Sequence, residues 1–171
     1  MTVAAIHNAL GIPPDYGRNP FRPAFVDAQL LVGVGVDSLG RPQRLAPVAA
    51  LAWTKMVEAA RRDGVYLLLE SGFRSIDYQC ELFQNKLAAG QPIDTILTVN
   101  AAPGFSQHHT GCAVDVGAPG IEALTEQFEN TESFGWLVAY ANDFGFSLSY
   151  PRGNPYGFIY EPWHWAHAAI G

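Results

Sequence analysis

The chain has 171 residues, a length that fits one domain with a sizeable core. Sixteen acidic against ten basic side chains give a net charge of −6, which argues against a general nucleic-acid-binding surface. No run approaches the roughly 20 apolar residues that span a bilayer, and the N-terminus lacks the basic and apolar regions of a signal peptide. We therefore expect a protein without a membrane span that is cytoplasmic as synthesised.

The beginning of the chain is rich in glycine and proline, which predicts an extended segment that wraps the surface. Within this segment the stretch LLVGVGVDSLGRP predicts a strand, with its three valines on one side, that runs into a turn at 38–40. We expect a single domain over residues 1–171, in which 1–44 form the extended segment and 45–171 form the core.

Three helices are predicted by apolar spacing and by end signals. The first, in APVAALAWTKMVEAARRDG, has Pro47 in its first turn and ends at Gly64. The second, in SIDYQCELFQNKLAAG, is N-capped by Ser75 and ends at Gly90. The third lies in ESFGWLVAYANDFG. The residues expected to face inward are Val48, Leu51, Ala52, Met56 and Ala59 in the first helix, Ile76, Cys80, Phe83 and Leu87 in the second, and Phe134, Leu137, Val138 and Ala141 in the third.

Four further stretches predict strands: VYLLLESGFRS, TGCAVDVG, FSLSY and YGFIYEPWHW. Pro162 interrupts the last of them, so this strand must lie at an edge or carry a bulge. Strands and helices are mixed along the chain, which predicts an α+β domain with helices packed on a small antiparallel sheet. The only cysteines, Cys80 and Cys112, form no C-x-x-C pair, and we interpret both as buried thiols.

Polar side chains interrupt two of the apolar strands, where an unpaired carboxylate or imidazole costs several kcal/mol to bury. Asp115 stands in CAVDVG, and both Glu161 and His164 stand in YEPWHW. A bound cation explains all of them, since zinc takes imidazole nitrogens and carboxylate oxygens and leaves one position to water at catalytic sites. His108, Asp115 and His164 would supply three protein ligands. Gly111 allows the turn that returns the loop of His108 to Asp115.

Glu161 stands three residues before His164. On a regular strand, residues three apart point to opposite faces, so Pro162 must introduce a local kink if both side chains are to face one ion. With that kink in place, Glu161 is positioned as the general base for the metal-bound water, whose pKa zinc lowers to about 7.

Three motifs in this chain carry a family resemblance. SQHHTGCAVD matches S-x-H-x-x-G-x-A-x-D, EPWH matches E-x-W-H, and SGFRS precedes both. In this order and at these separations they resemble the VanY-type D-alanyl-D-alanine carboxypeptidases, over about residues 45–164. The wider group is the LAS metallopeptidases, which includes VanX-type dipeptidases and peptidase-type phage endolysins. The resemblance implies an LAS/hedgehog-like metallopeptidase fold, with 45–171 as the catalytic core, and a Zn²⁺ cofactor.

The same resemblance implies roles for five residues. Zinc ligands are expected at His108, Asp115 and His164. Glu161 is expected to be the catalytic base. Arg74, in SGFRS, is similar to the family arginine that contacts the substrate and stabilises the developing oxyanion, a role that suits a permanently charged guanidinium.

Two more polar residues, Ser106 and Gln79, occupy positions that resemble substrate-contacting residues of the family. An alternative role for Arg74 is purely structural, as the partner of a carboxylate such as Glu70 or Asp77.

Some features leave roles open or depart from the family pattern. His109 is interpreted as a loop residue or as one that supports the ligands, and His167 competes with His164 as a ligand, although the spacing from Glu161 favours His164. Many relatives have Arg-Tyr where residues 166–167 are Ala-His, so any substrate contact by that arginine is missing. The sequence ends at Gly171, so we expect affinity for the polymeric wall to come from the catalytic domain alone.

The leading hypothesis is therefore a zinc-dependent peptidase that hydrolyses peptidoglycan stem peptides or their precursors as a D-alanyl-D-alanine carboxypeptidase. We expect it to be a monomer, with delivery to the cell wall or periplasm left open. An L-alanyl-D-glutamate endopeptidase of the endolysin type would use the same metal site. A non-catalytic zinc-containing binding module is a third alternative, against which the presence of Glu161 and Arg74 argues. The acidic charge argues against a nucleic acid as partner.

Overall fold

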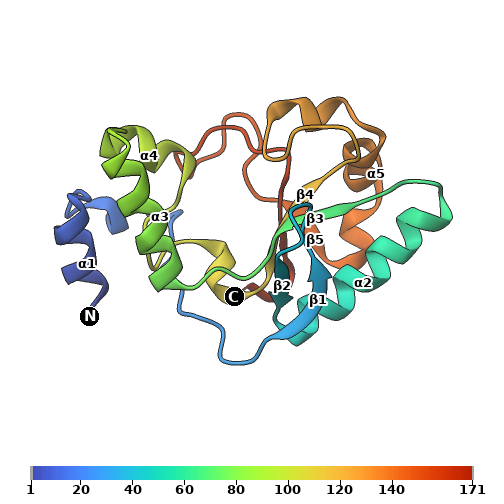
Figure 1. Ribbon diagram of the computed structural model, residues 1–171, viewed down its shortest axis with the longest axis horizontal. Helices are drawn as coiled ribbons and strands as arrows, with labels where there is room; N and C mark the ends of the chain where they lie inside the picture. The colour runs from blue at the N-terminus through green and yellow to red at the C-terminus, as the bar shows by residue number, and fades with distance from the viewer. Residues whose placement is uncertain (1, 171) are drawn as a thin grey trace.

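A four-stranded antiparallel sheet, in the order β3-β4-β6-β5, lies at the centre of this computed structural model, which describes residues 2–170 (Figure 1). A separate hairpin, β1-β2, lies beside it. The strands are β1 (Val32–Val36), β2 (Pro42–Leu45), β3 (Leu68–Ser71), β4 (Ala113–Gly117), β5 (Phe146–Leu148) and β6 (His164–His167). The predicted α+β class, with helices packed on a small antiparallel sheet, is confirmed.

The helices divide into two groups on either side of the central sheet (Figure 1). The α-helices are α1 (Val3–Leu10), α2 (Pro47–Arg62), α3 (Ile76–Ala88), α4 (Ile93–Val99) and α5 (Glu132–Tyr140). The 3-10 helices are η1 (Tyr16–Arg18), η2 (Gln107–Thr110), η3 (Glu126–Asn130), η4 (Ala141–Phe144) and η5 (Ala168–Ile170). Helices α2 and α5 pack with the sheet in one apolar core, whereas α1, α3 and α4 form a second core of their own.

The sequence predicted an extended N-terminal segment, but this segment begins with helix α1 and is therefore not extended throughout. The Thr2 hydroxyl accepts a hydrogen bond from the backbone N–H of Ala5, and Gly11 ends the helix in the left-handed conformation. Ile6 and Leu10 bury the inner face of this helix in the second core. These caps are local signals, and the glycines and prolines that follow them obscured the helix. Helix α4 and strand β2 were also not predicted.

Helix α2 has the predicted ends but a different buried face. Val48 and Leu51, expected inside, are 50% and 59% exposed. Trp53 and Met56 face the core together with small residues, so only Met56 of the predicted stripe is fully buried. The reason is that alanines on the inner face let the helix approach the sheet closely. Helix α5 shows the same error at Val138, which is 59% exposed.

The last predicted strand begins only at His164. The residues before it form a turn, in which the backbone N–H of His164 donates to the carbonyl of Glu161 at 3.1 Å. Pro162 suits the second position of such a turn because its φ is already fixed. Cys112 is buried and Cys80 is half-buried, and both are free thiols. Among the described residues no helix is long and apolar enough to cross a membrane.

Candidate metal centre

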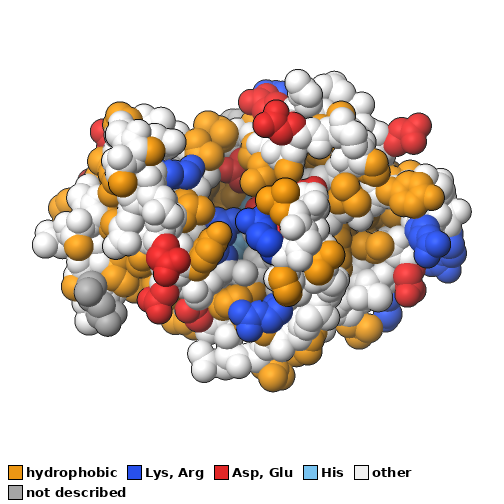
Figure 2. Space-filling view, in the orientation of Figure 1, with side chains coloured by type: hydrophobic (Ala, Val, Ile, Leu, Met, Phe, Trp, Pro, Cys, Tyr) orange, Lys and Arg blue, Asp and Glu red, His pale blue; other side chains and the backbone are white. Residues whose placement is uncertain are grey.

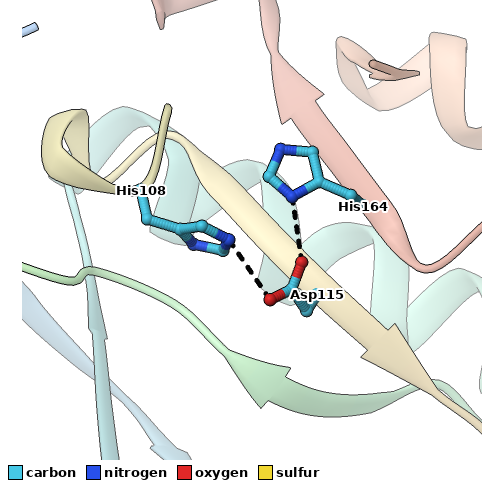
Figure 3. Close-up of side chains that lie close together, drawn as sticks. All are labelled: His108, Asp115 and His164. Atoms are coloured by element: carbon cyan, nitrogen blue, oxygen red, sulfur yellow. Dashed lines mark hydrogen bonds and ion pairs between the residues drawn. The ribbon is translucent and has the colours of Figure 1, made fainter. Parts of the chain in front are cut away.

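Three side chains from three elements converge beside the sheet (Figure 3). His108 comes from η2, Asp115 from β4 and His164 from β6, and their ligand atoms all lie within 4.8 Å of one another. Strands β4 and β6 pair so that Asp115 is directly opposite His164, which places both side chains on one face of the sheet. The three residues predicted as metal ligands are therefore brought together in a single cluster.

The loop that carries His108 is shaped by its own ends. The Ser106 hydroxyl accepts a hydrogen bond from the backbone N–H of His108 at 3.3 Å and so caps η2. Gly111 ends the turn at φ 67° and donates its N–H to the carbonyl of His108 at 3.2 Å. This left-handed conformation favours glycine, and it lets the chain turn directly into β4.

The His108 ring is held in one orientation by the backbone. Its Nδ1–H donates to the carbonyl of Gly72 at 2.7 Å, which leaves Nε2 pointing at Asp115 Oδ2, 3.2 Å away. Burial lowers the pKa of His108 to about 4, against the opposing effect of the Asp115 carboxylate. The ring is therefore neutral at pH 7, the form in which histidine binds a metal.

The His164 ring is oriented in the same manner by a side chain. Its Nε2–H donates to Gln107 Oε1 at 2.8 Å, and its Nδ1 lies 3.0 Å from Asp115 Oδ1. The same oxygen of Gln107 accepts a hydrogen bond from the Ser149 hydroxyl at 2.7 Å. Sequence reasoning missed Gln107, and its one available signal was its position beside His108 in the loop.

These contacts leave an arrangement that a cation would complete. When both imidazoles are neutral and donate their outer N–H groups, their inner nitrogens present lone pairs to the two oxygens of Asp115. These lone pairs repel the Asp115 carboxylate. All three residues are only 3% exposed, so water does not screen this repulsion. Burial acts to raise the pKa of Asp115, but a proton on either facing imidazole nitrogen supplies charge and a hydrogen bond that outweigh burial and hold this pKa well below its usual range. A cation between the rings and the carboxylate would stabilise the ionised Asp115 in the same way. Two nitrogens and one carboxylate are a donor set that fits a catalytic zinc ion.

We expect Gln107→Leu to weaken zinc binding by about 10–100-fold, because the ring of His164 loses the acceptor that fixes its tautomer. Gln107→Glu keeps an acceptor at this position and should retain the affinity of the unmodified protein. Competition with a chromophoric chelator measures both variants. Zinc affinity of Gln107→Leu within twofold of the unmodified chain would contradict this role.

Arg74 lies at the edge of the cluster, with its guanidinium Nη2 3.7 Å from Asp115 Oδ2. Nη1 donates to Gln79 Oε1 at 3.1 Å and Nη2 donates to the Ser71 hydroxyl at 3.2 Å. The amide of Gln79 is fully buried and also donates to the carbonyl of Ala101 at 2.8 Å. The amide oxygen of Gln79 thus holds Arg74 while its nitrogen is bonded to Ala101, and the predicted contact of Gln79 with substrate stays a prediction.

Glu161 faces the cluster from the turn that precedes β6. Its Oε2 lies 4.0 Å from His164 Nδ1, so the kink that the spacing required is present as the turn at Pro162. Glu161 is 6% exposed. Burial, with a further contribution from the nearby charge of Asp115, raises the pKa of Glu161 to about 9.

The two histidines whose roles were left open lie outside the cluster. His109 is fully buried, donates from Nδ1 to the carbonyl of Arg74 at 2.6 Å and accepts at Nε2 from the N–H of Gly104 at 3.1 Å. It therefore links the arginine segment to the ligand loop. His167 accepts at Nδ1 from the N–H of Ala169 and packs against Phe146.

A cavity of about 370 Å³ opens onto the cluster. Figure 2 shows a hollow near the centre of the face drawn, with basic side chains beside it. The cavity is lined by all three cluster residues and by Arg74, Ser106, Glu161 and Trp163. Tyr150, which was not predicted, also lines it and stacks on the ring of His164 with the centroids 4.7 Å apart. The site can therefore admit a small substrate beside the ligands, the carboxyl group of Glu161 and the guanidinium.

Comparison with known proteins identifies a family and several relatives of this chain. The model of the family described as VanY, D-alanyl-D-alanine carboxypeptidase, matches residues 42–170. A D-alanyl-D-alanine carboxypeptidase of Enterococcus faecalis is 34% identical over 163 residues, which cover 90% of this chain and 56% of the relative. The chain spans about half the length of two of the curated relatives that it matches.

Solved structures of similar fold agree with this match. The LdcB LD-carboxypeptidase superposes with a TM-score of 0.74 at 30% identity, over 86% of this chain and 73% of that one. VanYB in complex with D-alanine-D-alanine gives 0.66 at 32%, over 86% and 81%. A VanY D,D-pentapeptidase variant in complex with Zn(II) gives 0.63 at 29%, over 88% and 89%.

Proposed function

Because the chain belongs to the VanY family of D-alanyl-D-alanine carboxypeptidases, we propose that it is a zinc-dependent peptidase that removes the terminal D-alanine from peptidoglycan stem peptides or their precursors. The observation that carries this proposal is the pair of imidazole lone pairs that face one buried carboxylate, with Glu161 and Arg74 at the same cavity. Relatives described as D-alanyl-D-alanine carboxypeptidases support the choice of substrate.

His108, Asp115 and His164 would hold the zinc ion. A bound zinc ion supplies Lewis acidity, which lowers the pKa of water and polarises a carbonyl group. The neutral imidazole of His108 and the ionised carboxylate of Asp115 are already in their metal-binding protonation states at pH 7. No rearrangement of protons is needed at His108 or Asp115 before the ion binds.

The proton transfers are assigned to Glu161. As a carboxylate it accepts a proton from the attacking water, and as a carboxylic acid it then donates that proton to the leaving amine. Burial and the charge of Asp115 raise the pKa of Glu161 to about 9 in the metal-free site. The positive charge of a bound zinc ion would lower this pKa and favour the carboxylate that the first step needs.

The guanidinium of Arg74 is assigned to the negative charge that develops on the scissile carbonyl oxygen. Its hydrogen bonds to Gln79 and Ser71 fix the side chain before substrate arrives, so little reorganisation is needed during the reaction. Ser106 lines the same cavity and is proposed as a polar contact for the peptide. The combination of a base and a cation at the cavity argues against a non-catalytic zinc module.

Digestion of a synthetic stem pentapeptide and of purified sacculi, with and without a chelator, tests this function. We expect chelator-sensitive loss of one alanine from the pentapeptide, measured by mass spectrometry. Release of glycan strands from sacculi would instead identify the L-alanyl-D-glutamate endopeptidase. Zinc-dependent binding of the peptide without any product over a long incubation would identify a binding module and contradict the proposal.

The raised pKa of Glu161 predicts how the stability of the metal-free protein depends on pH. Between the unfolded value of 4.5 and the folded value of about 9, the native state holds a proton that the unfolded state has released. The free energy of unfolding contributed by this group therefore falls as pH rises through that window. Glu161→Gln should remove this slope, so its stability relative to the unmodified chain should increase from pH 5 to pH 9. Urea unfolding in the presence of a chelator measures the difference, and parallel pH profiles would contradict it.

A further inference from the structure

One wall of the cavity is formed by a single face of helix α3. Gln79, Leu82 and Lys86 all line the cavity, and their spacing of three and then four residues places them on the same side of the helix. Gln79 contacts Arg74 in the first turn, and Lys86 follows seven residues later, about 10 Å along the helix axis. Side chains on a helix lean toward its N-terminus, which directs Lys86 back toward Arg74.

Lys86 has no charged partner in the part of the chain that the structure describes. Every ion pair of residues 2–170 is formed by other side chains, and no described carboxylate lies within 4.0 Å of this ammonium group. The side chain is half-buried. Burial and the nearby charge of Arg74 both lower the pKa of Lys86. The mechanism proposed above does not use this residue.

Two cations thus line one cavity in a protein whose net charge is −6. Their mutual repulsion and the partial loss of hydration disfavour the charged state of Lys86, whereas an anion between or beside them would be attracted to both. The other lysine, Lys55, lies exposed on the outer side of α2 and meets no such environment. Val99 and Asn100, at and just after the end of α4, also line the cavity and carry no charge.

We propose that Lys86 binds a free carboxylate of the peptide substrate at the α3 wall of the cavity and thereby determines which peptides bind. This inference rests on the proposed peptidase function and names a contact for its substrate. A stem peptide offers this chemistry from two sources, the C-terminal carboxylate and the free α-carboxylate of a γ-linked glutamate.

The test compares Lys86→Gln with the matched surface variant Lys55→Gln, both loaded with zinc. Three synthetic pentapeptides are used: one with both carboxylates free, one with the C-terminus amidated, and one with the glutamate carboxylate amidated. KM and kcat are measured by mass spectrometry. Calorimetry then measures binding of the same peptides to Glu161→Gln and to the double variant Lys86→Gln/Glu161→Gln. This second measurement also covers peptides that the protein does not cleave.

With the unmodified peptide we expect Lys86→Gln to raise KM and the dissociation constant by about five- to tenfold, as for a partly exposed ion pair, with little change in kcat. The effect should disappear for the one amidated peptide that lacks the bound carboxylate, which identifies the source. Lys55→Gln should match the unmodified chain.

Three results would overturn the inference. An equal loss on all three peptides would show a structural role for Lys86, and no loss on any would show no role in binding. In either case, normal cleavage by the unmodified chain would leave the peptidase function intact. Absence of both cleavage and binding in the unmodified chain would reject the two proposals together.

Discussion

Glu161→Gln is expected to lower kcat by about 10²–10⁴-fold while the protein still binds one zinc ion per chain. Glutamine has the shape of the protonated glutamate, which is the form that burial favours when the metal is absent, so the variant should fold normally. It cannot accept a proton from water, and the attack and the protonation of the leaving amine both lose their catalyst. Turnover of the pentapeptide and zinc content by atomic absorption are the two measurements.

The matched control for this change is Glu58→Gln, at an exposed position of α2 far along the sequence from the site. It makes the same chemical substitution and should leave kcat unchanged. Normal turnover in Glu161→Gln would remove the residue from the mechanism. A loss of zinc together with turnover would show instead that Glu161 acts by supporting the ligands.

Asp115→Asn is expected to weaken zinc binding and to abolish turnover at limiting metal. The loss of affinity should exceed the ~10–100-fold seen when a residue that only hydrogen-bonds to a metal ligand is removed. The asparagine amide N–H can donate to one imidazole lone pair, and the Gly72 carbonyl and the Gln107 side chain still hold the two rings, but the amide brings no negative charge to balance a divalent ion. The two histidines therefore keep their positions while the site loses its one anionic ligand. Chelator competition measures the affinity directly.

Asp143→Asn provides the control, because this aspartate is exposed in η4 and changes the net charge of the chain by the same amount. Its zinc affinity should equal that of the unmodified protein. If Asp115→Asn bound zinc as tightly as this control, the ion would have to lie elsewhere, and the assignment of all three ligands would fail.

The residues around Asp115 show why much of the site was predictable from sequence. His108 and Asp115 are joined by one short loop and one strand, and the glycine between them signals the turn. The role of Pro162 followed from simple geometry, since a regular strand cannot direct Glu161 and His164 to the same side. Patterns of this kind are local, and the structure places their side chains together.

Features that depend on distant contacts were not predictable in this way. Gln107 orients His164, which is 57 residues away in the chain, and nothing in the local sequence connects them. The inner face of α2 was misassigned because apolar residues surround this helix, and only the packing against the sheet decides that Trp53 lies inside and Leu51 outside. Strand β2 has little apolar alternation and exists because it pairs with β1.

The segment where β2 passes into α2 has a consequence for how the chain can be divided. A Cβ atom at Gly72 would lie 2.7 Å from the carbonyl oxygen of Arg44, and one at Gly111 would lie 2.7 Å from the backbone nitrogen of Ala46. Gly72 holds the ring of His108, and Gly111 closes the turn that carries it. The backbone at 44–46 therefore serves as a rigid template for the ligand loop, and a cut at residue 44 or 45 would separate the ligand from the surface against which it is shaped.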